Sequence, residues 1–230
     1  MVLLVGHRAN SWSKINRYLK WGVDALEIDL SISPDGELAV GHGYGSIKPA
    51  TLREAFFRKI SSIFLKEGGP KSLNEFLSYV AGRVRIWLDI KDRIPSECVA
   101  RVLHENGVEN IFVSSKYHDL LRKLRNALPT AKLYASIQAR PIDVISIVEA
   151  SNSDGVAVEI GFLDVDLIET LHSNGYSVAV WVVNDVDQAI WAASIGADII
   201  ITDRPDLISK GLRLEFRRGF LRKLYERLSR

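Results

Sequence analysis

The sequence predicts an α/β protein, a single (β/α)8 barrel, on three observations. Its 230 residues fit one barrel of this kind, which commonly fills such a length alone. Short apolar runs alternate with amphipathic segments of helical length along the whole chain. Eight strand–helix units of this kind follow one another, and short loops between them require parallel strands and right-handed crossovers. A doubly wound open sheet stays the alternative, because counting units does not exclude it.

The eight strand segments are mostly continuous apolar runs, the pattern of strands that are covered on both faces. A sheet with one face in water would instead alternate apolar and polar positions. We predict strands at residues 2–5, 25–32, 84–90, 110–115, 132–136, 154–158, 177–183 and 198–202.

Helices are predicted between these strands from their capping residues. Ser11 or Ser13 can begin a helix that runs to Trp21, with Gly22 as its end. Ser72 and Glu75 form a capping box that opens a helix to about residue 81. The other helices are expected at 95–106, 117–128, 141–151, 163–174, 185–195 and 205–210, the last ending at Gly211.

One region after the second strand breaks this rhythm. Asp35-Gly36 is a hairpin turn signal, which predicts a short return strand at 37–41. The stretch 43–70 is long for a connection from strand to helix, and residues 51–66 within it have a helical pattern. We therefore expect a helical insertion over the active-site face of a barrel domain that spans residues 1–212.

Composition excludes several classes of protein. The net charge of +2 is too small to indicate nucleic acid as a partner. The single cysteine, Cys98, excludes an intramolecular disulfide framework and multi-cysteine metal sites. The chain has no apolar run long enough to cross a membrane and no secretory leader, so we expect a cytoplasmic protein.

The net charge nevertheless hides a basic segment at 213–230, which carries +5. Apolar residues recur there at helical spacing, so we expect a basic amphipathic helix beyond the barrel. It either lies on an anionic membrane surface, at the inner face of the membrane, or packs on the barrel or another subunit. We favour packing, and the oligomeric state stays open.

A candidate metal site begins in the second strand. Glu27 and Asp29 are two residues apart, so their side chains share one face of a strand. Two like charges inside a barrel are costly unless a cation compensates them, and Mg²⁺ or Ca²⁺ prefers carboxylate oxygens. Asp89, at the end of the next parallel strand, is a third candidate ligand. The alternative is that one of the first two carboxylates faces outward and pairs with a helix.

Two histidines at strand ends complete a set that suits phosphodiester cleavage. His7 and His42 each have a glycine neighbour, which permits close approach of the backbone. One histidine would take a proton from the nucleophile, and the other would give one to the leaving oxygen. Arg8 and Lys91 are placed to stabilise the phosphoryl oxygens. The other three histidines fall in predicted helices, where we expect them on the surface.

Motifs along nearly the whole chain occur in the same order and at the same spacing as in one known family. They are His7-Arg8, Gly22, Glu27-Ile-Asp29, Asp35-Gly36, His42, Trp87-Leu-Asp89-Ile-Lys91, Val180-Trp181-Val182-Val183-Asn184, and the run from Gly196 to Pro205 that contains Thr202-Asp203. With these residues the chain resembles the glycerophosphodiester phosphodiesterase family, and more broadly the superfamily that it shares with the sphingomyelinase D enzymes.

The resemblance implies a role for each matching residue. Glu27, Asp29 and Asp89 would bind a divalent metal, and His7 and His42 would form the acid–base pair. It further implies that Arg8 and Lys91 hold the phosphate and that Trp181 lines the substrate pocket. Trp181 has an alternative role in the barrel core, which a large aromatic side chain fills well.

The sequence also departs from the family pattern. The family usually follows His-Arg-Gly with a loop and Glu-Asn-Thr, whereas this chain continues directly as Ala9-Asn10-Ser11. This short spacing resembles sphingomyelinase D, while Arg8 resembles the glycerophosphodiesterases.

We therefore predict a metal-dependent hydrolase that cleaves glycerophosphodiesters into an alcohol and glycerol 3-phosphate. A phospholipase D-like enzyme for lysophospholipids or sphingolipids, acting through a cyclic phosphate, is the first alternative. A barrel that binds phosphate ligands without turnover is the second.

Overall fold

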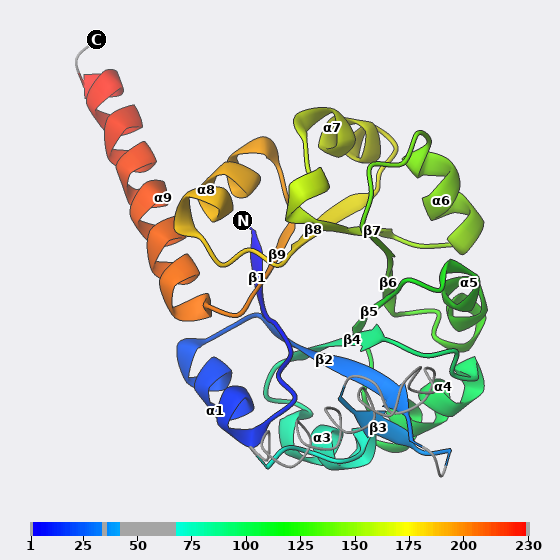
Figure 1. Cartoon of the computed structure of the whole chain (residues 1–230). Helices are drawn as coiled ribbons and strands as arrows, with labels where there is room; N and C mark the ends of the chain where they lie inside the picture. The colour runs from blue at the N-terminus through cyan, green and yellow to red at the C-terminus, as the bar shows by residue number, and fades with distance from the viewer. Residues whose placement is uncertain (1, 34–35, 42–67, 229–230) are drawn as a thin grey trace, which may run out of the picture.

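The computed structural model describes residues 2–33, 36–41 and 68–228, with side chains as far as residue 216. Eight parallel strands pair in the order β1-β9-β8-β7-β6-β5-β4-β2, and β1 also pairs with β2. The sheet therefore closes on itself, and Figure 1 shows the helices arranged in a ring around it. The predicted (β/α)8 barrel is confirmed, and the open-sheet alternative is wrong.

Every predicted strand is present within one or two residues at each end. The short return strand pairs antiparallel with β2, as the turn at Asp35-Gly36 predicted. The strands are β1 Leu3–Gly6, β2 Ala25–Ile32, β3 Leu38–Val40, β4 Arg85–Ile90, β5 Phe112–Ser115, β6 Lys132–Ile137, β7 Gly155–Glu159, β8 Ser177–Trp181 and β9 Ile199–Thr202.

The helices begin and end largely where their capping residues indicate. Ser11 accepts a hydrogen bond from the N–H of Lys14 at the start of α1, and Gly22 ends this helix with φ 68°. Ser72 caps α3 in the same way. The described helices are α1 Trp12–Trp21, α3 Leu73–Val80, α4 Ser96–Glu105, α5 His118–Ala127, α6 Val144–Ser151, α7 Val165–Ser173, α8 Val186–Ile195 and α9 Pro205–Leu228, with a 3-10 turn at Ile160–Phe162.

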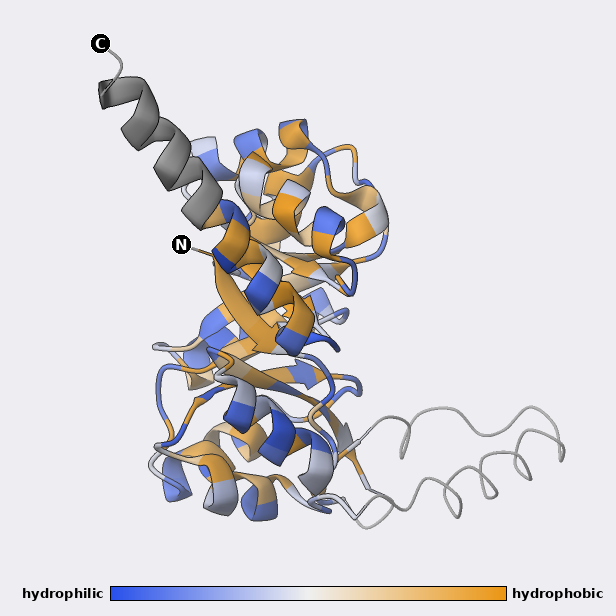
Figure 2. Ribbon diagram, turned by 90° about the vertical axis from the view of Figure 1, so that its left-hand side faces the viewer, coloured by the Kyte–Doolittle hydropathy of each residue, from blue (hydrophilic) through white to orange (hydrophobic). Residues whose placement is uncertain are grey.

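The core has two parts, one between the strands and the helices and one inside the barrel. In Figure 2 the strands are mainly hydrophobic, and the helices carry hydrophilic residues on their outer sides. Inside the barrel, Trp87 stacks on Phe112 and lies 4.9 Å from Tyr134, measured between ring centroids. This apolar plug closes the barrel below the carboxyl ends of the strands, so polar groups above it are shielded from water on one side.

The last helix is longer than the sequence predicts. The expected end at Gly211 is wrong, because α9 continues without a break from Pro205 to Leu228. The basic segment thus prolongs the last barrel helix and runs past the ring of helices (Figure 1). Gly211 instead permits close packing, since a Cβ atom there would lie 2.3 Å from Val186 Cγ1 on α8.

Most of the predicted insertion at 43–70, including the helical pattern at 51–66, lies outside the described residues. Within the described part of the chain, no helix is long and apolar enough to cross a membrane.

The role of Gly211 predicts an unusual response to Gly211→Ala. In a free helix this change adds about 1 kcal/mol of stability. Here we expect it to lower the free energy of unfolding by about 1–2 kcal/mol, because the stiff side chain of Val186 must move. In a Val186→Ala background the same change should be neutral or stabilising. Chemical denaturation of the four proteins measures this, and equal stabilisation in both backgrounds would contradict the packing role.

Candidate functional site

The predicted site residues gather at the carboxyl ends of the strands, where barrel enzymes hold their active sites. A cavity of about 590 Å³ opens there. Its wall contains these described residues: His7, Arg8, Glu27, Trp87, Asp89, Ile90, Lys91, Ser114, Lys116, Ser136, Gln138, Ala157, Trp181, Val182, Ile201 and Asp203.

Glu27, Asp29 and Asp89 form one group, which we call the carboxylate cluster. Each offers an oxygen within 4.8 Å of the oxygens of the other two. Asp29 and Asp89 lie side by side because β2 and β4 pair in parallel with these two residues in register. Glu27 is 2% exposed and Asp29 is completely buried. The alternative in which one of these side chains faces outward to a helix is therefore wrong.

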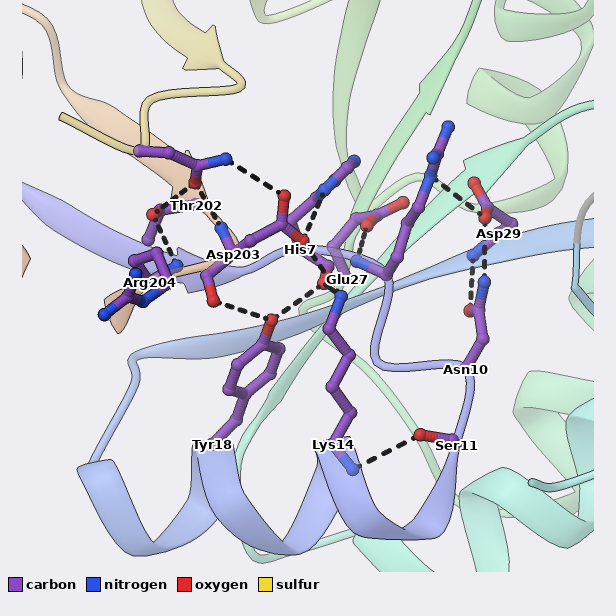
Figure 3. Close-up of polar contacts among 12 residues, drawn as sticks. His7, Asn10, Ser11, Lys14, Tyr18, Glu27, Asp29, Thr202, Asp203 and Arg204 are labelled. Atoms are coloured by element: carbon purple, nitrogen blue, oxygen red, sulfur yellow. Dashed lines mark hydrogen bonds and ion pairs between the residues drawn. The ribbon is translucent and has the colours of Figure 1, made fainter. Parts of the chain in front are cut away.

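Basic and amide groups compensate part of this negative charge. Lys91 Nζ lies 2.9 Å from Asp29 Oδ1 and also contacts Asp89 Oδ2. Arg8 donates its backbone N–H to Glu27 Oε2 at 2.5 Å, and its Nε lies 3.5 Å from Asp29 Oδ2. Asn10 makes two hydrogen bonds to Asp29, one to the carboxylate and one from the backbone N–H (Figure 3).

These contacts shift the pKa values of Glu27 and Asp29 in opposite directions. Burial, with the charges of Asp29 and Asp89, raises the pKa of Glu27 well above its usual range. Burial alone would also raise the pKa of Asp29, but Lys91, Arg8 and Asn10 outweigh it and lower that pKa. Burial opposes the charge on Lys91, yet the three carboxylates prevail and raise the pKa of this ammonium. With all three carboxylates ionised, the cluster therefore carries more negative charge than Lys91 and Arg8 balance.

The donor chemistry of the cluster fits a divalent cation. Carboxylate oxygens are the preferred ligands of Mg²⁺ and Ca²⁺, and three converge here. Asp29 Oδ1 is buried and accepts no hydrogen bond within the described structure, although Lys91 Nζ is close. The Lys91 ammonium is the charged neighbour of this buried oxygen, and a bound cation would share the compensation of its charge.

A second hydrogen-bonded group, the His7 cluster, joins the ends of β1 and β9. It consists of His7, Lys14, Tyr18 and Asp203, which Figure 3 labels, and of Asn184. The distance from His7 Nδ1 to Asp203 Oδ1 is 3.2 Å, and Lys14 Nζ lies 2.9 Å from the same oxygen. Asn184 donates to Asp203 Oδ2 at 3.2 Å. Tyr18 donates to the backbone oxygen of His7 at 3.1 Å.

Asp203 is the carboxylate of this cluster, and it orients His7. Burial alone would raise its pKa, but hydrogen bonds from His7 and Lys14 hold the pKa of this carboxyl well below its usual range. An ionised carboxylate can only accept hydrogen bonds, so His7 Nδ1 is the donor. The other ring nitrogen, Nε2, is then the one that can exchange a proton in the cavity.

The structure also places Trp181 and three of the remaining histidines. Trp181 lines the cavity and also packs on the apolar plug, and its indole N–H donates to the Ala157 oxygen at 2.9 Å. His104 and His172 are exposed as expected, whereas His118 is half-buried and its Nε2 lies 3.0 Å from the Ser136 oxygen. His42 lies outside the described residues.

Several site residues were not singled out from the sequence. Lys14 and Tyr18 lie four residues apart on α1, and this spacing was the available signal that both face the end of β1. Ser114, the last but one residue of β5, donates to Asp89 Oδ1 at 2.9 Å, and the Trp87 indole N–H donates to Ser114 Oγ. Asn10 was noted only as part of a motif.

The chain is similar to known proteins of one family. A model described as "Glycerophosphoryl diester phosphodiesterase family" matches residues 87–207. A glycerophosphodiester phosphodiesterase of Caldanaerobacter subterraneus subsp. tengcongensis is 22% identical, over 91% of this chain and 98% of its own length. One from Bacillus altitudinis is 24% identical, over 86% of this chain and 89% of its own length.

Solved structures share the fold. A phosphodiesterase of Oleispira antarctica, in complex with the product sn-glycerol-3-phosphate, has a TM-score of 0.75 at 18% identity and covers 92% of this chain and 96% of its own. A glycerophosphodiester phosphodiesterase of Thermotoga maritima has a TM-score of 0.69 at 22% identity, covering 91% and 98%.

The raised pKa of Glu27 predicts that this carboxylate destabilises the metal-free protein. Above the ordinary glutamate pKa the unfolded chain releases this proton while the folded one retains it, so stability falls as the pH rises. In EDTA at neutral pH, we expect Glu27→Gln to raise the free energy of unfolding by about 1–3 kcal/mol. The gain should shrink toward pH 4, where both states are protonated.

Denaturant titrations at several pH values measure this effect. Glu105→Gln, which removes an exposed carboxylate of α4, is the matched control and should change little. A Glu27→Gln protein less stable than the wild type at neutral pH would show that the cluster is not strained by like charge.

Proposed function

Because the chain belongs to the glycerophosphoryl diester phosphodiesterase family and is thus a phosphoric diester hydrolase, we propose that it hydrolyses glycerophosphodiesters to an alcohol and glycerol 3-phosphate. The observation that carries this proposal is that Glu27 and Asp89 of the carboxylate cluster line the same cavity as His7 and Asp203 of the His7 cluster. The named product of the Oleispira relative supports the same substrate class.

Glu27, Asp29 and Asp89 would hold a divalent cation, Mg²⁺ or Ca²⁺. When bound there, the cation would act as a Lewis acid toward phosphoryl oxygens. Arg8 and Lys91 border the carboxylates and would bind the non-bridging oxygens of the phosphate. Trp181, which lines the same cavity, would contact the rest of the substrate.

His7 and His42 would carry the protons. One removes a proton from the attacking water, and the other donates a proton to the alcohol oxygen as its bond to phosphorus breaks. His7 is prepared for this by Asp203, which leaves Nε2 for exchange. Gly41, directly before His42, donates its N–H to the backbone oxygen of Asp29 at 2.9 Å, which ties the last described residue before His42 to the strand of the carboxylate cluster.

Three polar side chains in the described cavity wall favour a polar alcohol over an acyl chain. Beyond the phosphate-binding groups, the wall contains Ser136 of β6 together with Lys116 and Gln138, which directly follow β5 and β6. These side chains can hydrogen-bond to hydroxyl groups, whereas the acyl chain of a lysophospholipid would bury them without partners. We therefore propose the deacylated diester as substrate. This reaction belongs to lipid turnover, and it requires no contact with a membrane.

A substrate panel followed by ³¹P NMR tests the proposal. Glycerophosphocholine, lysophosphatidylcholine and sphingomyelin are compared with and without Mg²⁺, Ca²⁺ and EDTA. We expect glycerol 3-phosphate from glycerophosphocholine with either cation, and none with EDTA. A cyclic phosphate from a lipid substrate would instead identify the phospholipase D-like reaction, and activity in EDTA would refute the metal site.

Histidine variants test the acid–base roles in the same assay. Removing a general acid or base typically lowers the rate by about 10²–10⁴-fold, and we expect this loss in kcat for His7→Ala and His42→Ala. His104→Ala, which changes an exposed histidine of α4, is the control and should retain full activity. Full activity of His7→Ala would remove this residue from the mechanism.

A further inference from the structure

Lys14 contacts both partners of the hydrogen bond that orients His7. Its Nζ lies 2.9 Å from Asp203 Oδ1, the oxygen that His7 Nδ1 also contacts. The same ammonium donates to the backbone oxygen of His7 at 2.9 Å. One cation therefore links the backbone of the histidine to the carboxylate that its own ring contacts.

The placement of Lys14 follows from α1. The N-cap at Ser11 fixes the first turn of the helix, where Lys14 lies. Tyr18, four residues later on the same face, places its hydroxyl 3.1 Å from the backbone oxygen of His7 and 3.3 Å from that of Asp203, so its one hydrogen can bond to either. One face of α1 therefore presents two donors, Lys14 and Tyr18, to the residues that follow β1 and β9.

Burial distinguishes Lys14 from an ordinary surface lysine. Its side chain is 23% exposed, and that of Asp203 is 35% exposed. It lies behind His7 and is not among the described residues that line the cavity. An exposed ion pair contributes little because its side chains move freely, but this ammonium has two fixed acceptors that limit its movement.

We propose that Lys14 is a positioning residue for His7, which fixes Asp203 so that the imidazole donates from Nδ1 and presents Nε2 to the cavity. Without the ammonium, the Asp203 carboxylate keeps the neutral amide of Asn184 as its donor besides His7 among the described residues, and it can rotate away from the ring. The effect of Lys14 on catalysis rests on the proposed function, in which His7 transfers a proton. Its effect on the orientation of the His7 ring does not depend on that function.

The kinetic test compares Lys14→Met, Lys14→Arg and Lys20→Met. Lys20, an exposed lysine of the same helix, is the matched control for loss of charge. We expect Lys14→Met to lower kcat by about tenfold with KM changed less than about twofold, since the residue orients a reacting group and does not touch substrate. Lys14→Arg should recover most of kcat, and Lys20→Met should resemble the wild type.

A second readout does not depend on turnover. Ring ¹⁵N chemical shifts of labelled histidine distinguish a protonated nitrogen from one with a lone pair, and His7→Asn assigns the signal. In the neutral ring we expect protonated Nδ1 in the wild type and Lys14→Arg, and a mixture of tautomers in Lys14→Met. Unchanged shifts in Lys14→Met would overturn the proposal. Altered shifts in a protein without diesterase activity would support it while refuting the proposed function.

Discussion

The site depends on holding three like-charged carboxylates together at the buried ends of two adjacent strands. Parallel pairing of β2 with β4 places Asp29 beside Asp89. Glu27 lies two residues before Asp29, on the same face of β2. Repulsion and lost hydration make such a group unfavourable. Lys91 and Arg8 are placed where they reduce this cost. The apolar plug beneath the site keeps water out and so strengthens any attraction to a cation.

The first strand connects this cluster with the His7 cluster. Gly6 allows the ring of Tyr18 to approach, since a Cβ atom at Gly6 would lie 2.4 Å from that ring. Arg8 adopts a left-handed conformation, with φ 49°, and turns its backbone N–H to Glu27. Between them, His7 contacts Asp203. Successive residues of one strand end therefore serve both groups, which fixes their relative position.

The sequence predicts those parts of the molecule that local signals encode. Ser11 and Gly22 mark the ends of α1, and the spacing of Glu27 and Asp29 places both carboxylates on one face. The contact between Lys14 and Asp203 spans 189 positions, so no local pattern reveals it. The sequence predicts the wrong role for Gly211, because glycine both ends helices and permits close packing. The contact with Val186 in the folded chain distinguishes these two roles.

A crystal structure grown with Mn²⁺, with data collected for anomalous scattering, tests most directly whether the carboxylate cluster is a cation site. We predict one strong anomalous peak within about 2.5 Å of oxygens from Glu27, Asp29 and Asp89. We also expect Lys91 to move away from Asp29 as the ion takes over part of its charge compensation. A peak held by other residues, with Lys91 still between Asp29 and Asp89, would contradict the assignment.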